Sequence, residues 1–503
     1  MTQLTIQLAS TEDTTRLGQD LALALRTGDL VTLSGDLGAG KSTLARGLIR
    51  TIADDDSYEV PSPTFTIVQS YPELRLPISH VDLYRLSSAG EVDELGLDEA
   101  LEDGAVVVEW PERAEGALSA PSLSVTLVNE SDGRRALIDG EPAALARLQR
   151  SLAIREFLAK SGFANAERRY LLGDASARGY ETIATGAPHP LILMNSPYNS
   201  GGPILRDGKT YMQIAHLSQS VAAFVAVDKL LASKGFKVPE IHFEDLENGF
   251  LILENLGSEG VLDADGAPIV ERYEATVRLL AKLHQQSWPQ DVDVAKGYSH
   301  HIIHDFDRDA MMIEVELLSD WYVPRMSGTV LEPAQKAQYV VAWNKVFSQL
   351  NSCEKSLLLR DVHSPNILWR ENEIGINRVG LIDFQDAMIG PSAYDVASLI
   401  FDARVMIAPR LQDHLLSAYV DERHSGNALF DEAGFRTAFA IMAAQRNAKI
   451  LGIFVRLEQR DGKPFYLKHL PRIQAYFNRV IGHPVLAPVK DWCEKAGVLS
   501  PEI

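Results

Sequence analysis

The sequence predicts two domains: an α/β domain with a mostly parallel sheet over residues 1–145, and a separate α+β domain over residues 146–503. Three observations support this division. A chain of 503 residues exceeds what one hydrophobic core ordinarily serves. In the first part, short apolar runs alternate with helix-like runs, as in sheets whose strands are joined by helices. A connector with Gly, Pro and Ala at residues 139–149 then places the boundary near 145, within about ten residues.

The elements of the first domain follow from its sequence pattern. Residues 4–8 alternate between polar and apolar side chains, which predicts a strand. Ser10 is a favoured N-cap with acids just behind it, so a helix should run from there to about Leu25. Three further apolar runs predict buried strands, at residues 30–33, 78–83 and 105–110.

A glycine-rich loop connects the strand at 30–33 to an amphipathic helix that begins at about Lys41. Without Cβ atoms, its glycines let successive N–H groups turn toward phosphate oxygens, and the helix directs its positive end to the same place. Lys41 adds a charge for the β and γ phosphates, and the Ser42 hydroxyl is placed to bind Mg²⁺. The sequence therefore predicts a nucleotide site formed by Gly35, Asp36, Gly38, Ala39, Gly40, Lys41, Ser42 and Thr43.

Two acids follow predicted strands of this domain. Asp82 ends one apolar run, and Glu109 follows the run Ala105 to Val108. Nucleotide sites of such sheets lie at the carboxyl ends of strands, where a carboxylate can contact Mg²⁺ or orient a water molecule. Between these strands, residues 61–66 offer hydroxyls that would either contact the γ-phosphate or form a structural turn.

Composition limits the function classes. The net charge of −20 argues against a protein that wraps nucleic acid by itself, because phosphate binding depends on Lys and Arg. Two cysteines, Cys353 and Cys493, lack metal-ligand spacing and indicate a reducing compartment. No signal-peptide pattern or apolar run of membrane-spanning length is present, so we expect a cytoplasmic protein that does not bind membranes.

The first domain resembles the TsaE family, the small ATPases of bacterial threonylcarbamoyladenosine tRNA modification. The resemblance covers roughly residues 1–140 and rests on LSGDLGAGKST, VPSPTFTIVQSY, HVDLYRL, the acidic stretch 91–102 and VVVEWPERAEG, in that order. It implies ATP hydrolysis coupled to a complex of TsaB- and TsaD-type subunits. The protein would contact tRNA only through that complex. The resemblance also implies that Ser42 and Glu109 hold Mg²⁺ and that Asp82 and Glu109 are catalytic.

In the second domain, the segment LLLRDVHSPNILW places Asp361 five positions before Asn366, and LIDFQDA places Asp383 seventeen positions beyond that asparagine. Phosphoryl transfer to a hydroxyl needs a carboxylate that orients the acceptor and accepts its proton. It also needs an amide oxygen and a second carboxylate that fix Mg²⁺ on the triphosphate. The three residues supply this set at the spacing of a kinase catalytic loop and its metal-binding strand. Asp386 would contact substrate or solvent, and Asp395 would brace the loop.

Residues 148–500 resemble the aminoglycoside phosphotransferase family, which has a two-lobed, protein-kinase-like fold. The finer pattern is similar to the N-acetylmuramate/N-acetylglucosamine kinases (AmgK), on residues 173–178, 191–194, 254–257, the catalytic segment and 445–464. By this resemblance ATP is the phosphate donor and an amino sugar the acceptor. Nucleotide contacts would come from Gly173 and Ser176 over the phosphates and from Glu254 and Leu256 between the lobes.

Three questions stay open at this point. Asn195 stands roughly where a typical kinase has a strand lysine, and Arg178 is a possible substitute cation. A late basic segment with Arg446, Lys449 and Arg456 on one helical face would bind an acidic group or be solvated. The second domain is interpreted as a sugar kinase; the alternatives are a nucleotide-binding regulatory pseudokinase and a kinase for another small hydroxyl or amine.

Overall fold

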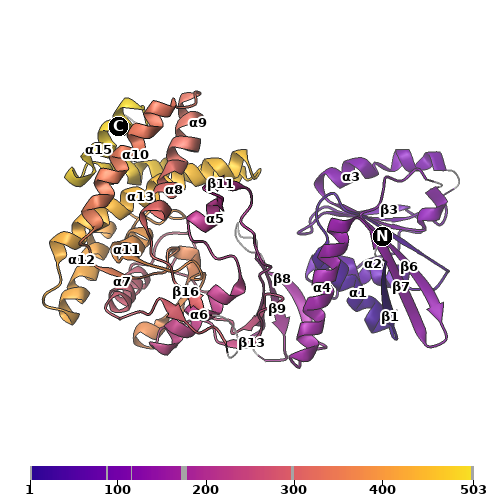
Figure 1. The fold of residues 1–503 in the computed structure, drawn as a ribbon. Coiled ribbons are helices and arrows are strands. Elements are labelled where there is room, and N and C mark those ends of the chain that lie inside the picture. The colour runs from indigo at the N-terminus through magenta and orange to yellow at the C-terminus, as the bar shows by residue number, and fades with distance from the viewer. Residues whose placement is uncertain are drawn as a thin grey trace. The chain divides into compact units, whose positions relative to one another are not determined.

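The structure is a computed structural model, and it describes residues 3–86, 89–114, 116–171, 178–187, 189–295 and 300–499. The chain divides into two compact units, Met1–Asn195 and Ser196–Ile503, and Figure 1 follows it through both. Helix α4 (Pro142–Lys160) covers most of the connector that the sequence indicated at residues 139–149, and it packs on α1 (Thr11–Ala24) within the first unit. The predicted boundary at residue 145 therefore falls inside a helix, and it stays a prediction.

A seven-stranded sheet in the order β1-β7-β6-β2-β5-β4-β3 forms the centre of the first unit. The strands predicted at residues 4–8, 30–33, 78–83 and 105–110 are all present as β1, β2, β4 and β5, and Ser10 caps α1 through a capping box. The sheet and the elements connected to it are β1 (Leu4–Leu8), β2 (Leu30–Gly35), α2 (Lys41–Ala53), β3 (Val68–Tyr71), β4 (Ile78–Asp82), α3 (Leu97–Asp103), β5 (Ala105–Glu109), β6 (Leu123–Glu130) and β7 (Gly133–Gly140).

The sheet is mixed, which corrects the expectation of a mostly parallel one. The four central strands β6, β2, β5 and β4 run parallel. The pairs β1–β7, β6–β7 and β3–β4 are antiparallel. Both β3–β4 and β6–β7 are joined by connections too short for a crossover, and a short connection between paired strands forces an antiparallel hairpin.

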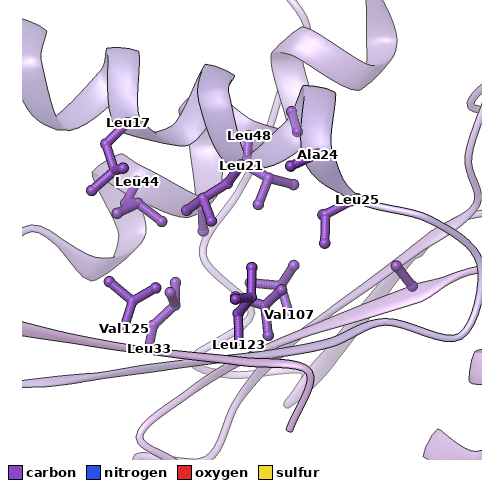
Figure 2. Close-up of a cluster of buried hydrophobic side chains, with 14 of the residues drawn as sticks. Leu17, Leu21, Ala24, Leu25, Leu33, Leu44, Leu48, Val107, Leu123 and Val125 are labelled. Atoms are coloured by element: carbon purple, nitrogen blue, oxygen red, sulfur yellow. The ribbon is translucent and has the colours of Figure 1, made fainter. Parts of the chain in front are cut away.

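Both faces of the central strands are buried. Side chains alternate along β5, so that Val107 belongs to the core beneath α1 and α2, whereas Val106 and Val108 belong to the core on the opposite face. Figure 2 shows the first of these cores, where leucines of α1 and α2 meet strand side chains that include Leu33, Leu123 and Val125. Apolar burial on both faces fixes the strands whose carboxyl ends carry Asp82 and Glu109.

The first unit also contains three antiparallel strands after α4, which are β8 (Glu167–Leu171), β9 (Gly179–Ala184) and β10 (Leu191–Asn195). The fully buried guanidinium of Arg168 on β8 joins this meander to α1. It donates to Asp20 on α1 at 2.7 Å and to Glu181 on β9 at 2.7 Å. Arg155 on α4 reaches the second oxygen of Asp20, also at 2.7 Å.

The second unit is mainly helical around two short hairpins. Strand β17 pairs with β20, and β18 pairs with β19. The connections of these strands therefore place residues 359–366 and residues 382–387 beside one another. The elements of this unit are β11 (Ile204–Arg206), β12 (Lys209–Thr210), α5 (Tyr211–Ile214), α6 (Val221–Ser233), β13 (Ile241–Asp245), β14 (Phe250–Leu253), α7 (Val270–His284), β15 (Asp291–Val292), β16 (His301–Ile302), α8 (Arg308–Leu317), α9 (Val323–Ser327), α10 (Pro333–Phe347), β17 (Lys355–Leu358), β18 (Ile367–Trp369), β19 (Val379–Leu381), β20 (Met388–Pro391), α11 (Ala393–Ile400), α12 (Pro409–Gly426), α13 (Glu432–Gln459), α14 (Leu470–Ile481) and α15 (Ala487–Lys495).

Helix α13 is the central helix of this unit and packs against α8, α11 and α14. Its length and composition alone would suit a membrane span, but 94% of that stretch is buried inside the protein. The apolar composition of α13 is therefore explained by its place in the core of the second unit. Cys353 and Cys493 are both free cysteines.

Helices α1 and α2 approach each other closely at two glycines. A Cβ atom at Gly18 would lie 2.5 Å from the carbonyl oxygen of Leu44 and 2.9 Å from the backbone nitrogen of Leu48. A Cβ atom at Gly47 would likewise lie 2.8 Å from the carbonyl oxygen of Thr15. Because α2 begins at Lys41, these contacts position the helix that ends the glycine-rich loop.

We expect Gly18→Ala to lower the free energy of unfolding of the first unit by about 1–3 kcal/mol, because the added methyl must push the α2 backbone away. Gly90→Ala is the matched control. Its Cβ would meet nothing within 4 Å, and its backbone lies outside the left-handed region. Urea denaturation of the full chain checks this prediction, which is wrong if the two variants unfold at the same urea concentration.

Candidate active sites

The glycine-rich loop of the first unit lies between β2 and α2 and has the backbone that its glycines permit. Gly35, Gly38 and Gly40 have φ angles of 135°, 78° and 108°, in the left-handed region. Gly40 is also the N-cap of α2, and a Cβ atom at Gly35 would overlap the carbonyl oxygen of Leu127 at 2.4 Å. The loop therefore requires glycine, as expected for a phosphate-binding loop.

The two strand-end acids lie opposite each other, because Asp82 on β4 and Glu109 on β5 are register partners. Glu109 accepts hydrogen bonds from the Ser42 hydroxyl at 2.9 Å and pairs with His80 Nε2 at 3.0 Å. Asp82 accepts a hydrogen bond from the Thr64 hydroxyl at 2.7 Å. The sequence had left the loop at residues 61–66 open between a contact with the γ-phosphate and a structural turn. The hydrogen bond from Thr64 shows that this loop contacts an acid of the site.

These residues line one cavity of about 360 Å³ together with the loop. In it, the Lys41 ammonium donates to the carbonyl oxygens of Gly35 at 2.6 Å and Asp36 at 3.0 Å, and it lies 3.5 Å from the centre of the Trp110 ring. Burial lowers the pKa of Lys41. Trp110 has a φ of 61°, a strained value for a residue with a side chain.

Arg134 on β7 also lines this cavity. Its Nη1 donates to the Thr14 hydroxyl at 3.0 Å and would lie 3.1 Å from a Cβ atom at Gly40. No local pattern marks this arginine, because β7 reaches the loop only through the pairing of strands far apart in the sequence.

The oxygen donors of this site fit a magnesium ion. Mg²⁺ is usually held by one or two protein oxygens together with substrate phosphates, and the contact between Ser42 and Glu109 brings a hydroxyl and a carboxylate together beside the phosphate-binding loop. Within the described residues no cluster of three or more His, Cys, Asp and Glu side chains suits a metal held by protein alone.

In the second unit, the three residues predicted from their spacing meet at the ends of the two hairpins. Asn366 Nδ2 donates to the carbonyl oxygen of Asp361 at 2.9 Å and to Asp383 Oδ2 at 3.2 Å. Asp383 has a φ of 62°, a strained turn that directs the end of β19 toward the catalytic loop. An amide oxygen and a carboxylate at this point suit Mg²⁺ on a bound triphosphate.

Asp395 holds the backbone of the catalytic loop, as the sequence predicted. Its buried carboxylate on α11 accepts from the N–H groups of Leu359 at 2.7 Å and Arg360 at 2.9 Å. Arg360 has a φ of 69°. Asp395 therefore stabilises the turn that presents Asp361.

Beneath the loop lies a buried carboxylate, Glu314 on α8, which sequence reasoning missed. It forms an ion pair with Arg360, and Lys449 Nζ lies 2.7 Å from its Oε1. Gln445 Nε2 donates to its other oxygen at 2.8 Å. Burial alone would raise the pKa of Glu314, but Lys449 and Arg360 lower it, so the group stays ionised.

Two residues of the late basic segment, Arg446 and Lys449, therefore contact acids inside the protein. Lys449 binds Glu314, and Arg446 Nη1 lies 3.6 Å from Asp361 Oδ1. Burial raises the pKa of Asp361, but Lys449 and Arg446 more than offset this and lower it to about 2. Asp361 is thus a carboxylate at neutral pH and can accept hydrogen bonds. Arg456 instead stacks on the Tyr211 ring at 4.8 Å.

The nucleotide contacts predicted for the kinase-like domain are placed only in part. Gly173 and Ser176 lie outside the described residues. Glu254 pairs with Lys237 at 2.6 Å, and the Leu256 side chain lies against Gly380 of β19. Asn195, which the sequence placed roughly at the position of a kinase strand lysine, accepts two hydrogen bonds from Arg150 on α4, at 2.8 and 2.9 Å.

Asp386, which the sequence left open between substrate and solvent, contacts the backbone of another segment. Its Oδ1 accepts from the backbone N–H of Ser218 at 2.6 Å, which ties residues 216–220 to the turn after Asp383.

Two family models match the chain. A model described as threonylcarbamoyl adenosine biosynthesis protein TsaE matches residues 8–137, and one described as phosphotransferase enzyme family matches residues 167–434. An N-acetylmuramate/N-acetylglucosamine kinase of Pseudomonas putida is 33% identical over 319 residues, which cover 62% of this chain and 84% of that protein. A kinase of the same name from Caulobacter vibrioides is 29% identical over 361 residues, 69% of this chain and 96% of that protein. A tRNA threonylcarbamoyladenosine biosynthesis protein TsaE of Rickettsia conorii is 38% identical over 128 residues, 25% of this chain and 73% of that protein.

We expect Glu314→Gln to lower the stability of the second unit by about 3–5 kcal/mol, because it leaves Arg360 and Lys449 buried without an anion. The matched control is Glu271→Gln, which breaks an exposed ion pair with Arg378 and should cost below about 1 kcal/mol. Thermal and urea denaturation of the full chain compare the two. Equal losses would show that Glu314 does not support the catalytic loop.

Proposed function

The chain belongs to two families, the TsaE family over its first domain and the phosphotransferase enzyme family over its second, and we propose that it carries out one reaction in each domain. The first domain would hydrolyse ATP as a component of threonylcarbamoyladenosine formation on tRNA. The second would transfer a phosphoryl group from ATP to the anomeric hydroxyl of N-acetylmuramate or N-acetylglucosamine. The resemblance of each part to relatives with these printed names supports the proposal.

For the first reaction, the supporting observation is the cavity that joins the phosphate-binding loop to Asp82 and Glu109. Ser42 and Glu109 would hold Mg²⁺, which on binding would neutralise charge on the phosphates. Asp82, held by the Thr64 hydroxyl, is the remaining carboxylate able to orient an attacking water molecule. We propose that TsaB- and TsaD-type subunits are the partners and that tRNA is reached only through them, in the cytoplasm.

For the second reaction, the supporting observation is the meeting of Asp361, Asn366 and Asp383. Asn366 and Asp383 would hold Mg²⁺ on the triphosphate, and the metal would stabilise charge on the transferred group. Asp361 would orient the acceptor hydroxyl and accept its proton. A carboxylate whose pKa is about 2 is a weak base, so its main contribution is orientation, with proton transfer late in the reaction.

A nucleotide-binding pseudokinase is the second candidate, and the absence of the strand lysine favours it. Asn195 at that position binds Arg150. Against it stands the complete catalytic set, together with a buried network that keeps Asp361 ionised. A pseudokinase has no need for either. We therefore prefer catalysis.

We expect Asp361→Asn to reduce phosphorylation of amino sugars by about 10²–10⁴-fold, because the acceptor loses its proton acceptor, while ATP hydrolysis in the presence of the TsaB- and TsaD-type subunits is unchanged. Lys41→Ala should have the opposite effects, because it removes a phosphate contact in the first domain only. Each variant controls for the other. The two-site proposal is wrong if either substitution removes both activities equally, measured as phosphorylated sugar by mass spectrometry and as released phosphate.

A further inference from the structure

A second cavity, of about 450 Å³, lies entirely within the second unit and has no role in the site described so far. Its walls come from residues 198–223, which include β12 and the start of α6, from the segment that contains β16, and from the turn that follows Asp383. The volume is in the range of ligand pockets. The side chains that matter below are Lys209, Gln213, His216, His301, His304 and Gln385.

Three contacts tie the walls of this cavity to the catalytic groups. Gln385 Nε2 donates to Asp383 Oδ1 at 2.8 Å. The guanidinium of Arg360, next to Asp361 in the loop, donates to the carbonyl oxygen of Ala215 at 3.1 Å. The carbonyl oxygen of His304 accepts from the backbone N–H of Ile389 on β20, the strand that pairs with β17 just before the catalytic loop. A molecule in the cavity would therefore adjoin both the metal-binding aspartate and the catalytic loop.

Gln385 is a buried residue of the cavity wall, with 4% of its surface exposed. Its Oε1 is shielded from solvent and has no hydrogen bond within the described part of the chain. The contribution of Gln385 to the cavity is therefore its hydrogen bond to Asp383, which places that aspartate next to the wall.

A pair of stacked imidazoles forms another part of the wall. The rings of His216 and His304 lie 4.5 Å apart at 14°, and His216 Nε2 is fixed by Asp307 at 2.8 Å. His216 has a φ of 50°, a strained backbone of the kind that gathers at binding sites. Burial, and then the neighbouring His216, lower the pKa of His304, which leaves it a neutral ring that can accept a hydrogen bond.

The charges of the residues that line the cavity argue against a polycationic ligand. No Asp or Glu is among the described residues that line the cavity, and Asp307 and Asp386 nearby already accept hydrogen bonds from His216 and from the Ser218 N–H. A polycation would lack an anion to bind here. The one lysine of the lining, Lys209, is exposed and forms no ion pair with any residue that the structure describes, so it can meet a carboxylate.

The position relative to Asp383 separates this cavity from the predicted adenine contacts. Leu256 of the interlobe segment packs on Gly380 of β19, which precedes Asp383. The cavity contacts Gln385 and Ala387, which follow it. Along the chain, Asp383 thus stands between the residue that meets the interlobe segment and the residues that line the cavity.

We propose that this cavity is the acceptor site: it binds the amino sugar between the His216–His304 pair and Gln385, and Lys209 at its edge recognises a carboxylate such as the lactyl group of N-acetylmuramate. This inference rests on the proposed kinase function. It adds specificity-determining residues to that function, and it predicts that a sugar with the carboxylate depends on Lys209 whereas one without it does not.

The first test replaces His304 in the full chain and compares the KM for N-acetylglucosamine with the KM for ATP. His304→Ala should raise the KM for the sugar about tenfold through the lost hydrogen bond and ring contact and leave the KM for ATP within about twofold. His304→Phe keeps the ring but removes its nitrogens, and it should show the same selectivity if the alanine variant fails to fold. A higher KM for ATP with an unchanged KM for sugar, or no change in either, overturns the proposal.

The second test uses the carboxylate. Lys209→Met should raise the KM for N-acetylmuramate about two- to fivefold, the value of an exposed ion pair, and leave the KM for N-acetylglucosamine unchanged. Lys495→Met, an exposed lysine on α15 that does not line the cavity, is the matched control and should change neither. Equal effects of Lys209→Met on both sugars contradict the assignment of Lys209.

Calorimetric titration of each sugar into the wild-type chain and into His304→Phe separates this inference from the function on which it rests. If the wild type binds a sugar without phosphorylating it and His304→Phe does not bind, the kinase proposal fails but the cavity assignment stands. If the wild type phosphorylates a sugar and the variants match it, the cavity assignment fails alone. If no sugar binds to the wild type, both fail.

Discussion

A carboxylate that is buried away from water needs a cation or hydrogen-bond donors beside it, and both parts of the chain are built around such buried acids. Glu109 is held by His80 and the Ser42 hydroxyl, and Asp395 by two backbone N–H groups of the catalytic loop. Glu314 is the extreme case, because it is fully buried and is matched by Arg360 and Lys449. The partners of these acids are themselves residues of the two sites, so neutralising the buried charge also sets the geometry of the phosphate chemistry.

Some of the residues with a strained backbone lie at the same places. Trp110, Arg360 and Asp383 all have positive φ angles although they carry side chains. Trp110 follows Glu109, Arg360 precedes Asp361, and Asp383 is itself an acid of a site. Such conformations cost free energy and persist only where surrounding contacts enforce them. At Arg360 those contacts are the hydrogen bond from its N–H to Asp395 and the ion pair with Glu314. His216, at the proposed acceptor cavity, belongs to the same group.

The cations of α13 show how a basic patch in a sequence can be internal. Arg446 and Lys449 lie on one helical face, as their spacing predicted, but that face is turned inward beneath Asp361. Their charge is used to keep a carboxylate ionised within a protein of net charge −20, and not to attract an anion from solvent. Recognition of an acidic group on the acceptor is accordingly assigned to Lys209, which stands on a different element and is exposed.

The sequence by itself determined the features whose parts are close together along the chain. The glycines of the phosphate-binding loop, the Ser10 cap, and the spacing of Asp361 and Asn366 are local patterns, and local patterns specify local geometry. It did not determine the antiparallel edges of the first sheet or the roles of Glu314, Arg134 and the His216–His304 pair. Glu314 lies 46 residues from Arg360 in the sequence, and Arg134 lies 120 residues from Thr14. Only tertiary structure brings such residues together, because their contacts depend on how strands pair and helices pack, and no short pattern in the sequence encodes that.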